Sequence, residues 1–274
     1  MEITRVGGAC VELEPPTSQS MEGDAFMPTY PKNLIVIPAL DEEHALPHTI
    51  AKLQALPDGY ELLVVNDGSS DATGQVALEL SRCSRLPLYV LNLAWNSGIG
   101  VAVQTGYLFA LDKGGYEYVI QFDADGQHDA GCIQNLVEEC RSQRLDMCVG
   151  SRFLSNSGEF RSTFWRRMGI RFFSTLISVL TQTKITDPTS GFRCAGPRAW
   201  QSFANRYPDD YPEPESLYWC IRNKFRVAEI PVLMHQRQTG ISSIHSFRSL
   251  YYMCKVTLAI LVDVLRAKEH HYGR

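Results

Sequence analysis

The chain has 274 residues, of which 45% are apolar and 20% charged, and its formal net charge is -4. This balance is typical of a globular chain and argues against a disordered or fibrous one. The slight negative charge provides no basic field for a nucleic-acid backbone, so nucleic acid is not an expected partner.

Residues 1–32 contain several prolines and no hydrophobic signal peptide, which predicts a flexible leader before the folded part. The chain has eight cysteines but no Cys-x-x-Cys pair. The spacings of zinc-ribbon and thioredoxin-like sites are therefore absent. Reduced structural thiols in a cytoplasmic protein are the simplest interpretation.

From Asn33 onwards, short apolar runs alternate with helical stretches. The runs predict strands buried on both faces, at 34–37, 61–65, 88–91, 118–122 and 147–150. The helical stretches lie at 42–56, 72–83, 100–113 and 129–143. This alternation predicts an α/β fold with a mostly parallel sheet flanked by helices. Ligands of such sheets bind beyond the carboxyl ends of the strands, where polar clusters follow these runs.

The pattern changes after residue 150. We expect a turn at 187–193, a proline-rich acidic loop at 208–214, a late strand at 227–234 and an apolar helix at 249–266. The expected organisation is a leader (1–32), one α/β domain (33–248) and a C-terminal helix with its tail (249–274).

Asp123-Ala124-Asp125 directly ends a buried apolar run, and Gln127 follows it. Two carboxylates one residue apart on a strand share a face. They can converge on Mg²⁺ or Mn²⁺, which favour carboxylate and phosphate oxygens. A metal held there bridges a diphosphate leaving group and neutralises its charge. An isolated Asp-x-Asp is more often a surface turn, but the position at a strand end favours a functional site.

Other polar residues also follow strands. Asp67 could accept a hydrogen bond from a nucleobase N–H, and Glu42 could meet ribose hydroxyls or merely occupy a favourable first helical turn. Gly98 and Gly100 precede a helix whose N-terminus could attract a phosphate. The strict dinucleotide fingerprint is absent, because Val103 stands in place of its third glycine, and this argues against a dehydrogenase.

Six motifs occur in a fixed order along the chain: Ile-Pro-Ala-Leu-Asp-Glu, Val-Asn-Asp-Gly-Ser-Ser-Asp, Asn-Ser-Gly-Ile-Gly, Phe-Asp-Ala-Asp-Gly-Gln-His, Gly-Ser-Arg and Asp-Pro-Thr-Ser-Gly-Phe-Arg. This ordered set resembles the family-2 glycosyltransferases of GT-A fold, especially the polyprenyl-phosphate or dolichyl-phosphate mannosyltransferase-like branch. The resemblance implies an inverting, metal-dependent hexosyltransferase. It would move a sugar from a UDP- or GDP-linked donor to a polyprenyl phosphate or another membrane-associated glycan or lipid acceptor.

The resemblance also implies roles for single residues. For the base and ribose, it implies Pro38, Ala39, Glu42 and Asp67. For the metal, Mg²⁺ or Mn²⁺, it implies Asp123, Asp125 and Gln127. For the sugar and diphosphate, it implies Arg152 and the late basic motif with Arg237 and Ser242, beside the glycines Gly98 and Gly100. Asp125 and Arg193, the latter in the Thr-Ser-Gly-Phe-Arg segment of the family, are implied as catalytic residues together with the acidic loop.

The acceptor decides whether a general base is needed. A hydroxyl acceptor needs one, ideally a carboxylate, and the acidic loop supplies Glu213 and Glu215. Glu213 falls near the acidic catalytic position of the family. A phosphate acceptor is already an anion and needs no base, so the loop would then only position the donor sugar. A solvated loop without a role is the alternative.

Two segments indicate a membrane surface. Aromatic residues alternate with cations that suit an anionic lipid phosphate, namely Arg161, Arg166, Arg167 and Arg171. The alternative is a helix packed on the sheet with its arginines in water. The apolar segment 250–265 contains Lys255 and Asp263 and is too short to span a bilayer. We therefore expect a cytoplasmic protein peripheral to the inner face of the cytoplasmic membrane, with room for a separate membrane subunit.

Three other functions remain open. One is transfer to a soluble saccharide hydroxyl. Another is a sugar nucleotidyltransferase, although the Gly-rich basic loop of those enzymes is replaced by Pro38-Ala-Leu-Asp-Glu. The third is a catalytically silent scaffold that binds a sugar nucleotide or a membrane partner.

Overall fold

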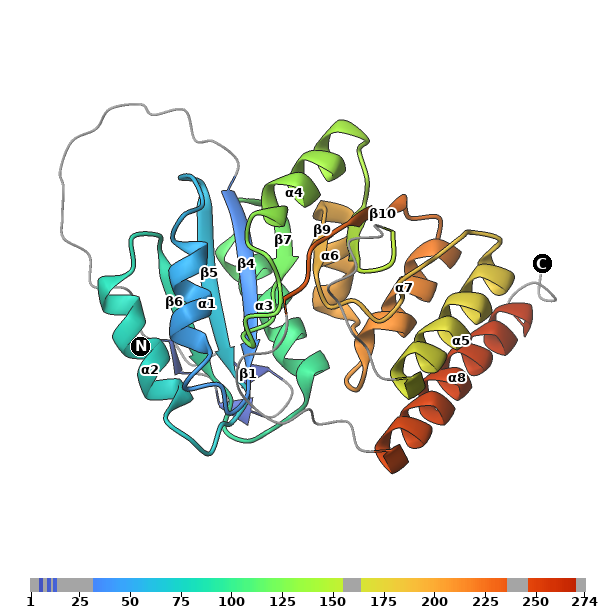
Figure 1. Cartoon of the computed structure of the whole chain (residues 1–274), viewed down its shortest axis with the longest axis horizontal. Coiled ribbons are helices and arrows are strands. Elements are labelled where there is room, and N and C mark those ends of the chain that lie inside the picture. Colours follow the sequence, from blue (N-terminus) through green and yellow to red (C-terminus); the bar gives the residue numbers. More distant parts are fainter. Residues whose placement is uncertain are drawn as a thin grey trace.

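The computed structural model describes residues 32–154, 164–235 and 246–269, together with three two-residue strands near the N-terminus (Figure 1). A single large sheet runs through the α/β part. Its strands are β4 (Lys32–Ala39), β5 (Tyr60–Asn66), β6 (Leu88–Asn92), β7 (Tyr116–Gln121), β8 (Met147–Ser151), β9 (Arg193–Ala195), β10 (Val227–Pro231) and the short β3 (Glu12–Leu13).

The strand order is β10-β8-β9-β7-β4-β5-β6-β3. β9 runs antiparallel to both β7 and β8, and β3 runs antiparallel to β6. The other pairings described within this sheet are parallel. The carboxyl ends of β4, β5, β6, β7 and β8 therefore meet at one edge, which brings the motifs that follow these strands together.

Strand residues alternate between two apolar cores, because successive side chains point to opposite faces of a sheet. In β4, for example, Leu34 and Val36 pack into one core, whereas Ile35 and Ile37 pack into the other. All four are almost fully buried. This is why these strands appear in the sequence as continuous apolar runs and not as alternating ones.

Helices cover both faces of the sheet (Figure 1). One core is closed by α1 (Leu46–Leu53), α2 (Thr73–Cys83) and α4 (Cys132–Ser142). The other is closed by α3 (Ile99–Lys113), α5 (Phe164–Thr181), α6 (Pro197–Asn205), α7 (Pro212–Arg222) and α8 (Ser246–Glu269). In Figure 1, α5 and α8 lie side by side at the end of the molecule farthest from α2.

The amino-end edge of the sheet holds a buried carboxylate that is fully paired. Glu61 accepts hydrogen bonds from Lys32 at 2.8 Å, from Lys113 at 2.8 Å and from the Tyr116 hydroxyl at 2.6 Å. Burial alone would raise the pKa of Glu61, but these donors outweigh it and hold the pKa below its ordinary value. This edge therefore joins the first residues of β4, β5 and β7.

The predicted elements differ from the observed ones mainly at their ends. The helix expected at 42–56 is shortened to α1, because residues 43–45 form a turn. The leader expected at 1–32 contains β1 (Arg5–Val6), β2 (Ala9–Cys10) and β3, and the two residues of β3 pair with β6. α8 begins before residue 249, and its Val256 and Ile260 are buried in the core that α3, α5, α6 and α7 also close.

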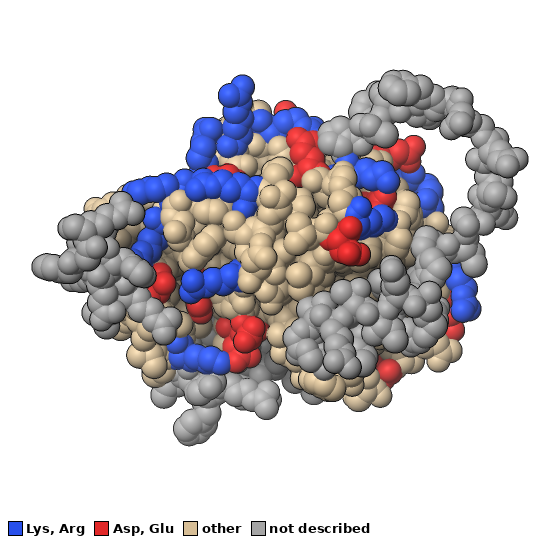
Figure 2. Space-filling view, turned by 180° about the vertical axis from the view of Figure 1, so that it is seen from behind, with Lys and Arg blue, Asp and Glu red and all other residues tan. Residues whose placement is uncertain are grey.

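Every helix in the described ranges is too short or too polar to cross a bilayer. On the face opposite that of Figure 1, positive and negative side chains are interspersed between wide uncharged areas (Figure 2). The two signs are mixed on this face, in keeping with the small net charge of the chain.

Candidate active site

The segment after β7 carries the first carboxylate of the predicted site. Asp123 is half-buried, and its Oδ2 lies 3.0 Å from Nε2 of the buried His128. Its Oδ1 is shielded from solvent and makes no hydrogen bond. Burial opposes ionisation, but His128, the Gln121 amide and Arg152 together hold the pKa of Asp123 below its ordinary value. The site therefore presents an ionised carboxylate with an unused oxygen.

The second carboxylate belongs to a tight turn. Oδ1 of Asp125 accepts a hydrogen bond from the Gln127 backbone N–H at 3.0 Å, and Gly126 between them has φ +73°. The Thr49 hydroxyl of α1 stabilises the turn by donating a hydrogen bond to the Ala124 carbonyl at 2.8 Å. The side-chain amide of Gln127 is directed at the His235 carbonyl, 3.5 Å away.

These residues fit a divalent cation that is shared with a substrate. No cluster of three or more metal-binding side chains occurs within residues 32–154, 164–235 and 246–269. Magnesium sites of phosphate-transfer enzymes often use only one or two carboxylates and complete their shell with substrate phosphates and water. Asp123, with its unpartnered oxygen, and Asp125 are a donor set of this kind. The role of Gln127 in a metal shell stays a prediction.

Arg152 is buried and paired. Its guanidinium forms a buried, bidentate ion pair with Asp187, with both N–O distances 2.6 Å, and it also donates to Thr189 at 2.8 Å. These hydrogen bonds hold the 187–189 turn, and contact of Arg152 with the sugar or diphosphate stays a prediction. Its charge nevertheless lowers the pKa of Asp123.

Arg193 is likewise buried and holds backbone in place. It donates to the carbonyls of Pro188 and Ser190, to the Ser216 hydroxyl at 2.9 Å and to the Glu213 carbonyl at 2.8 Å. The guanidinium thus joins the turn before β9 to the first turn of α7. We expected a catalytic residue here, and the structure shows a residue that positions Glu213.

Glu213 and Glu215 lie in the first turn of α7 and not in a loop. Pro212 opens the helix and Tyr211 before it has a left-handed backbone, with φ 50°. Residues two apart on a helix point in nearly opposite directions, so the two carboxylates separate. Glu213 lies on the side of Arg193 and Asp123. Burial raises the pKa of Glu213, and the Arg193 charge counteracts part of this rise.

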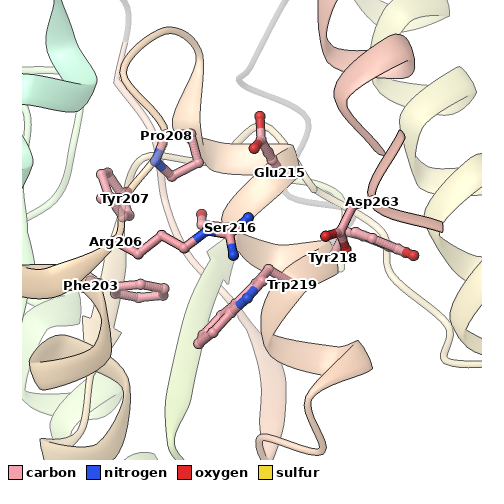
Figure 3. A pocket seen from close by; sticks show the side chains of 9 residues that line it. All are labelled: Phe203, Arg206, Tyr207, Pro208, Glu215, Ser216, Tyr218, Trp219 and Asp263. Carbon is pink, nitrogen blue, oxygen red and sulfur yellow. The ribbon is translucent and has the colours of Figure 1, made fainter. Parts of the chain in front are cut away.

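Glu215 faces a different place, a pocket between α6, α7 and α8 (Figure 3). Burial raises the pKa of Glu215, which the neighbouring Arg206 partly offsets. The pocket combines aromatic with charged and polar side chains and is lined by Phe203, Arg206, Tyr207, Pro208, Glu215, Ser216, Tyr218, Trp219 and Asp263. The structure therefore does not bring Glu215 together with the Asp-x-Asp carboxylates.

Asp67 is buried at the end of β5, where its carboxylate organises a loop. Oδ1 accepts from the Ser97 backbone N–H at 2.7 Å and Oδ2 from that of Gly98 at 3.0 Å. Burial raises the pKa of Asp67, and these two N–H groups oppose the rise. Each oxygen retains a second lone pair, so contact with a nucleobase stays a prediction.

Gly98 and Gly100 have a structural explanation that the sequence did not suggest. The Gly100 N–H donates to the Asp209 carbonyl at 3.0 Å. A Cβ at Gly100 would lie only 2.1 Å from the Pro208 carbonyl oxygen and 2.2 Å from that of Asp209. The backbone that leads to α7 therefore crosses directly over the start of α3. Our expectation of a phosphate at Gly100 is corrected, because protein backbone occupies that position.

The residues expected around the base lie at the end of β4. Pro38 and Ala39 are buried in the strand, and the Ala39 carbonyl accepts the Asp67 N–H at 2.9 Å. The Glu42 N–H donates to the Thr73 hydroxyl at 2.8 Å. Asp41, which we did not single out, accepts hydrogen bonds from the Ser70 backbone and hydroxyl. These contacts join the loops after β4 and β5.

Some predicted residues cannot be placed. Arg161, Arg237 and Ser242 lie outside the described residues, as does the side chain of Arg166. Arg167 and Arg171 are described, and both are exposed on α5. Sequence reasoning assigned no role to His128 and Gln121, although the former was part of a quoted motif and the latter precedes the Asp-x-Asp pair by two residues.

Solved structures share this fold. Glucosyl-3-phosphoglycerate synthase from Mycobacterium tuberculosis, in complex with Mn²⁺, UDP and glucosyl-3-phosphoglycerate, has a TM-score of 0.60 at 18% identity, over 85% of this chain and 79% of that one. Staphylococcus aureus TarS 1-349 in complex with UDP has a TM-score of 0.56 at 16% identity, over 85% of this chain and 65% of that one. The sheet with its flanking helices is therefore a GT-A fold.

Sequence comparison identifies the family. Residues 34–199 match the model of glycosyl transferase family 2. Polyprenol monophosphomannose synthase of Mycolicibacterium smegmatis is 28% identical over 215 residues, 77% of this chain and 80% of the relative. Undecaprenyl-phosphate mannosyltransferase of Micrococcus luteus is 29% identical over 219 residues, 76% of this chain and 86% of the relative. The chain belongs to glycosyl transferase family 2, as the ordered motifs predicted.

The close backbone crossing at Gly100 leads to a stability prediction. Gly100→Ala places a methyl group against two carbonyl oxygens and should lower the free energy of unfolding by about 1–3 kcal/mol. Gly169→Ala is the control, because its Cβ would meet only the Met253 sulfur at 3.8 Å within a helix. That variant should be neutral or more stable by up to about 1 kcal/mol. Urea unfolding measures both. An unaltered stability of Gly100→Ala, combined with weaker nucleotide binding, would restore the phosphate interpretation.

Proposed function

We propose that this protein is an inverting glycosyltransferase that moves a hexosyl group from a nucleoside-diphosphate sugar to a polyprenyl phosphate at a membrane surface. One observation carries the proposal. In a family-2 fold, Asp123 ends a buried strand as an ionised carboxylate with an unpartnered oxygen, and Asp125 lies beside it. A half-buried anion of this kind is suited to a cation shared with a diphosphate.

The donor is oriented by the loops at the carboxyl ends of the strands. Pro38, Ala39 and Glu42 hold the base and ribose, and Asp67 accepts an N–H of the base. Asp123 and Asp125 hold Mg²⁺ or Mn²⁺, which, when bound, neutralises the charge of the departing nucleoside diphosphate. The Arg152–Asp187 pair and His128 keep the Asp123 carboxylate ionised and oriented for this purpose.

The acceptor is proposed from the names of the relatives and from chemistry. Both quoted relatives are named as mannose transferases or synthases acting with a polyprenol or undecaprenyl phosphate. A phosphate oxygen attacks the anomeric carbon on the face opposite the diphosphate. The new carbon–oxygen bond forms as the bond to the nucleoside diphosphate breaks, and the configuration inverts. No proton has to be removed from a phosphate anion, so the reaction needs no general base.

A hydroxyl acceptor is the second candidate, and the environment of Glu213 favours it. This carboxylate is half-buried, lies near Asp123 and has a raised pKa. A general base is most effective when its pKa approaches the working pH. The two candidates differ in one measurable property, the dependence of the rate on the Glu213 carboxylate.

A membrane-facing surface is proposed on α5 and α8. The two helices approach each other at Gly169 of α5 and Met253 of α8. Each helix also carries exposed apolar side chains. On α5 these are Met168, Phe172, Val179 and Leu180, near the exposed Arg167 and Arg171. On α8 they are Leu258, Leu261 and Val262. Apolar side chains next to cations suit an interface with anionic lipids.

α8 also holds α7, the helix whose first turn carries Glu213, in position. Lys255 pairs with Asp210 just before α7, and Asp263 pairs with Arg222 near its end at 2.8 Å. α8 is thereby tied to both ends of the helix that carries Glu213. A membrane-bound α8 would place the acceptor phosphate and the donor site in one fixed geometry.

Removing one carboxylate tests the metal-dependent transfer. Asp125→Ala should lower sugar transfer to a polyprenyl phosphate on the order of 10³-fold with Mn²⁺ present, because charge on the diphosphate is no longer neutralised. Asp112→Ala, which removes an exposed carboxylate from α3, should leave the rate unchanged. Full activity of Asp125→Ala, or of the wild type with EDTA, contradicts the proposal. Absence of any donor turnover in the wild type would favour a silent scaffold.

Glu213→Gln distinguishes the two acceptors. With a phosphate acceptor, kcat should fall by less than about tenfold, whereas a hydroxyl acceptor that relies on this base would lose about 10²–10⁴-fold.

The same variant should change stability with pH. The folded-state pKa of Glu213 is raised, so its ionisation opposes folding above the unfolded pKa of 4.5. Glu213→Gln should therefore be more stable than the wild type at pH 7 but not at pH 4. Thermal unfolding at both values checks this, and equal melting temperatures at pH 7 would show that the carboxyl is not desolvated.

A charge on α8 tests the membrane surface. Leu258 is 63% exposed, and Leu258→Glu should weaken binding to vesicles of anionic phospholipid by about tenfold or more, because one apolar contact is lost and a repelling charge is added. Leu111→Glu makes the same change at a 46% exposed position on α3 and should bind as the wild type does. Cosedimentation measures both variants. Equal weakening of the two would indicate a general charge effect and no defined surface.

A further inference from the structure

One buried side chain near the carboxylates has no explanation in the proposed mechanism. Gln121 is the last residue of β7 and is 1% exposed. Neither its amide nitrogen nor its amide oxygen makes a hydrogen bond of good geometry. Buried polar side chains nearly always have partners in native proteins. A fully buried amide with both polar atoms unused therefore suggests a partner that binds later.

The position of Gln121 follows from the pleat of β7. Residues 121 and 123 point to the same face, while Phe122 points to the opposite face and packs against His128 and Phe192 with ring centroids 5.4 Å apart. A Cβ at Gly191 would lie 3.0 Å from Nε2 of Gln121 and 3.1–3.2 Å from the two oxygens of Asp123. These distances are shorter than ordinary Cβ contacts, so a glycine, with no side chain to cover them, is the residue that fits beside both polar groups.

Glu213 reaches the same place from α7. Gln121 is the partner of Arg193 in the β7–β9 ladder, and Arg193 holds the Glu213 carbonyl at 2.8 Å. The amide of Gln121 is close enough to both carboxylates to lower the pKa of Asp123 and to offset part of the rise of the pKa of Glu213. Gln121 and Asp123, which both have buried polar atoms without a partner, therefore lie beside Gly191, and Glu213 is close to them from α7.

We propose that Gln121 recognises the donor sugar, with its carboxamide donating to and accepting from hydroxyl groups of the hexose. A carboxamide offers one donor and one acceptor side by side, which matches the two properties of a sugar hydroxyl. The group lies between Asp123, on the diphosphate side, and Glu213. A hexose whose diphosphate is held at the Asp-x-Asp pair would extend toward this group. The inference rests on the proposed function and names a specificity residue of that site.

The test separates the sugar from the nucleotide. Gln121→Met keeps the volume and removes both hydrogen-bonding atoms. Calorimetry with Mn²⁺ compares UDP and GDP with UDP-glucose, UDP-N-acetylglucosamine and GDP-mannose. For the sugar nucleotide that the wild type binds best, Gln121→Met should bind at least about tenfold more weakly. Its affinity for the matching nucleoside diphosphate should stay within about twofold, because that ligand carries no hexose.

Each result decides between the alternatives. Equal losses for the sugar nucleotide and the nucleoside diphosphate would overturn the proposal, because Gln121 would then only position Asp123. Unchanged affinity for both would overturn it as well. A wild type that binds neither UDP nor GDP would refute the proposed function itself. Trp200→Phe is the control, since it removes another buried, unpartnered N–H from α6 and should leave both affinities unchanged.

Discussion

The site depends on one electrostatic balance, the ionisation of Asp123 in a half-buried position. Burial alone would raise the pKa of this carboxyl and so oppose the charged form that a cation needs. The ring of His128 at 3.0 Å and the charge of Arg152 outweigh this penalty. Arg152 is itself held in a buried ion pair with Asp187. This pair fixes the position of the Arg152 charge that helps to keep Asp123 ionised. The buried Arg152 and Arg193 thus hold the segments that surround the proposed reacting groups.

The two edges of the sheet differ in how their polar groups are satisfied. At the amino-end edge, both carboxylate oxygens of Glu61 accept hydrogen bonds, from three donors in all. At the carboxyl-end edge, Asp123 keeps an oxygen unpartnered and Gln121 keeps both polar atoms unpartnered. Leaving buried polar groups unpaired costs about 1–3 kcal/mol each, and a ligand that supplies the missing bonds at the carboxyl-end edge would recover this cost.

Local sequence patterns predicted much of the fold, and contacts between distant residues explain the rest. The apolar runs correctly indicated the α/β sheet, because both faces of these strands are buried. The helix at Glu213 was missed since three prolines in 208–214 suggested a loop, although a proline at the first helical position favours a helix start. Gly100 was misjudged because the chain that crosses it comes from residues 208–209, more than a hundred positions away. The contacts of Arg152, which was assigned to the ligand, and of Arg193, which was assigned to catalysis, were not foreseen because their partners, Asp187 and the start of α7, lie far off in sequence.

The cation between the two carboxylates is the most direct test of this account. Crystals of the protein grown with UDP or GDP and Mn²⁺ would give an anomalous signal from manganese. The account predicts a peak within coordination distance of Asp123 and Asp125 that also contacts the diphosphate. A nucleotide and metal found in the pocket beside Glu215, or at any place remote from the end of β7, would contradict it.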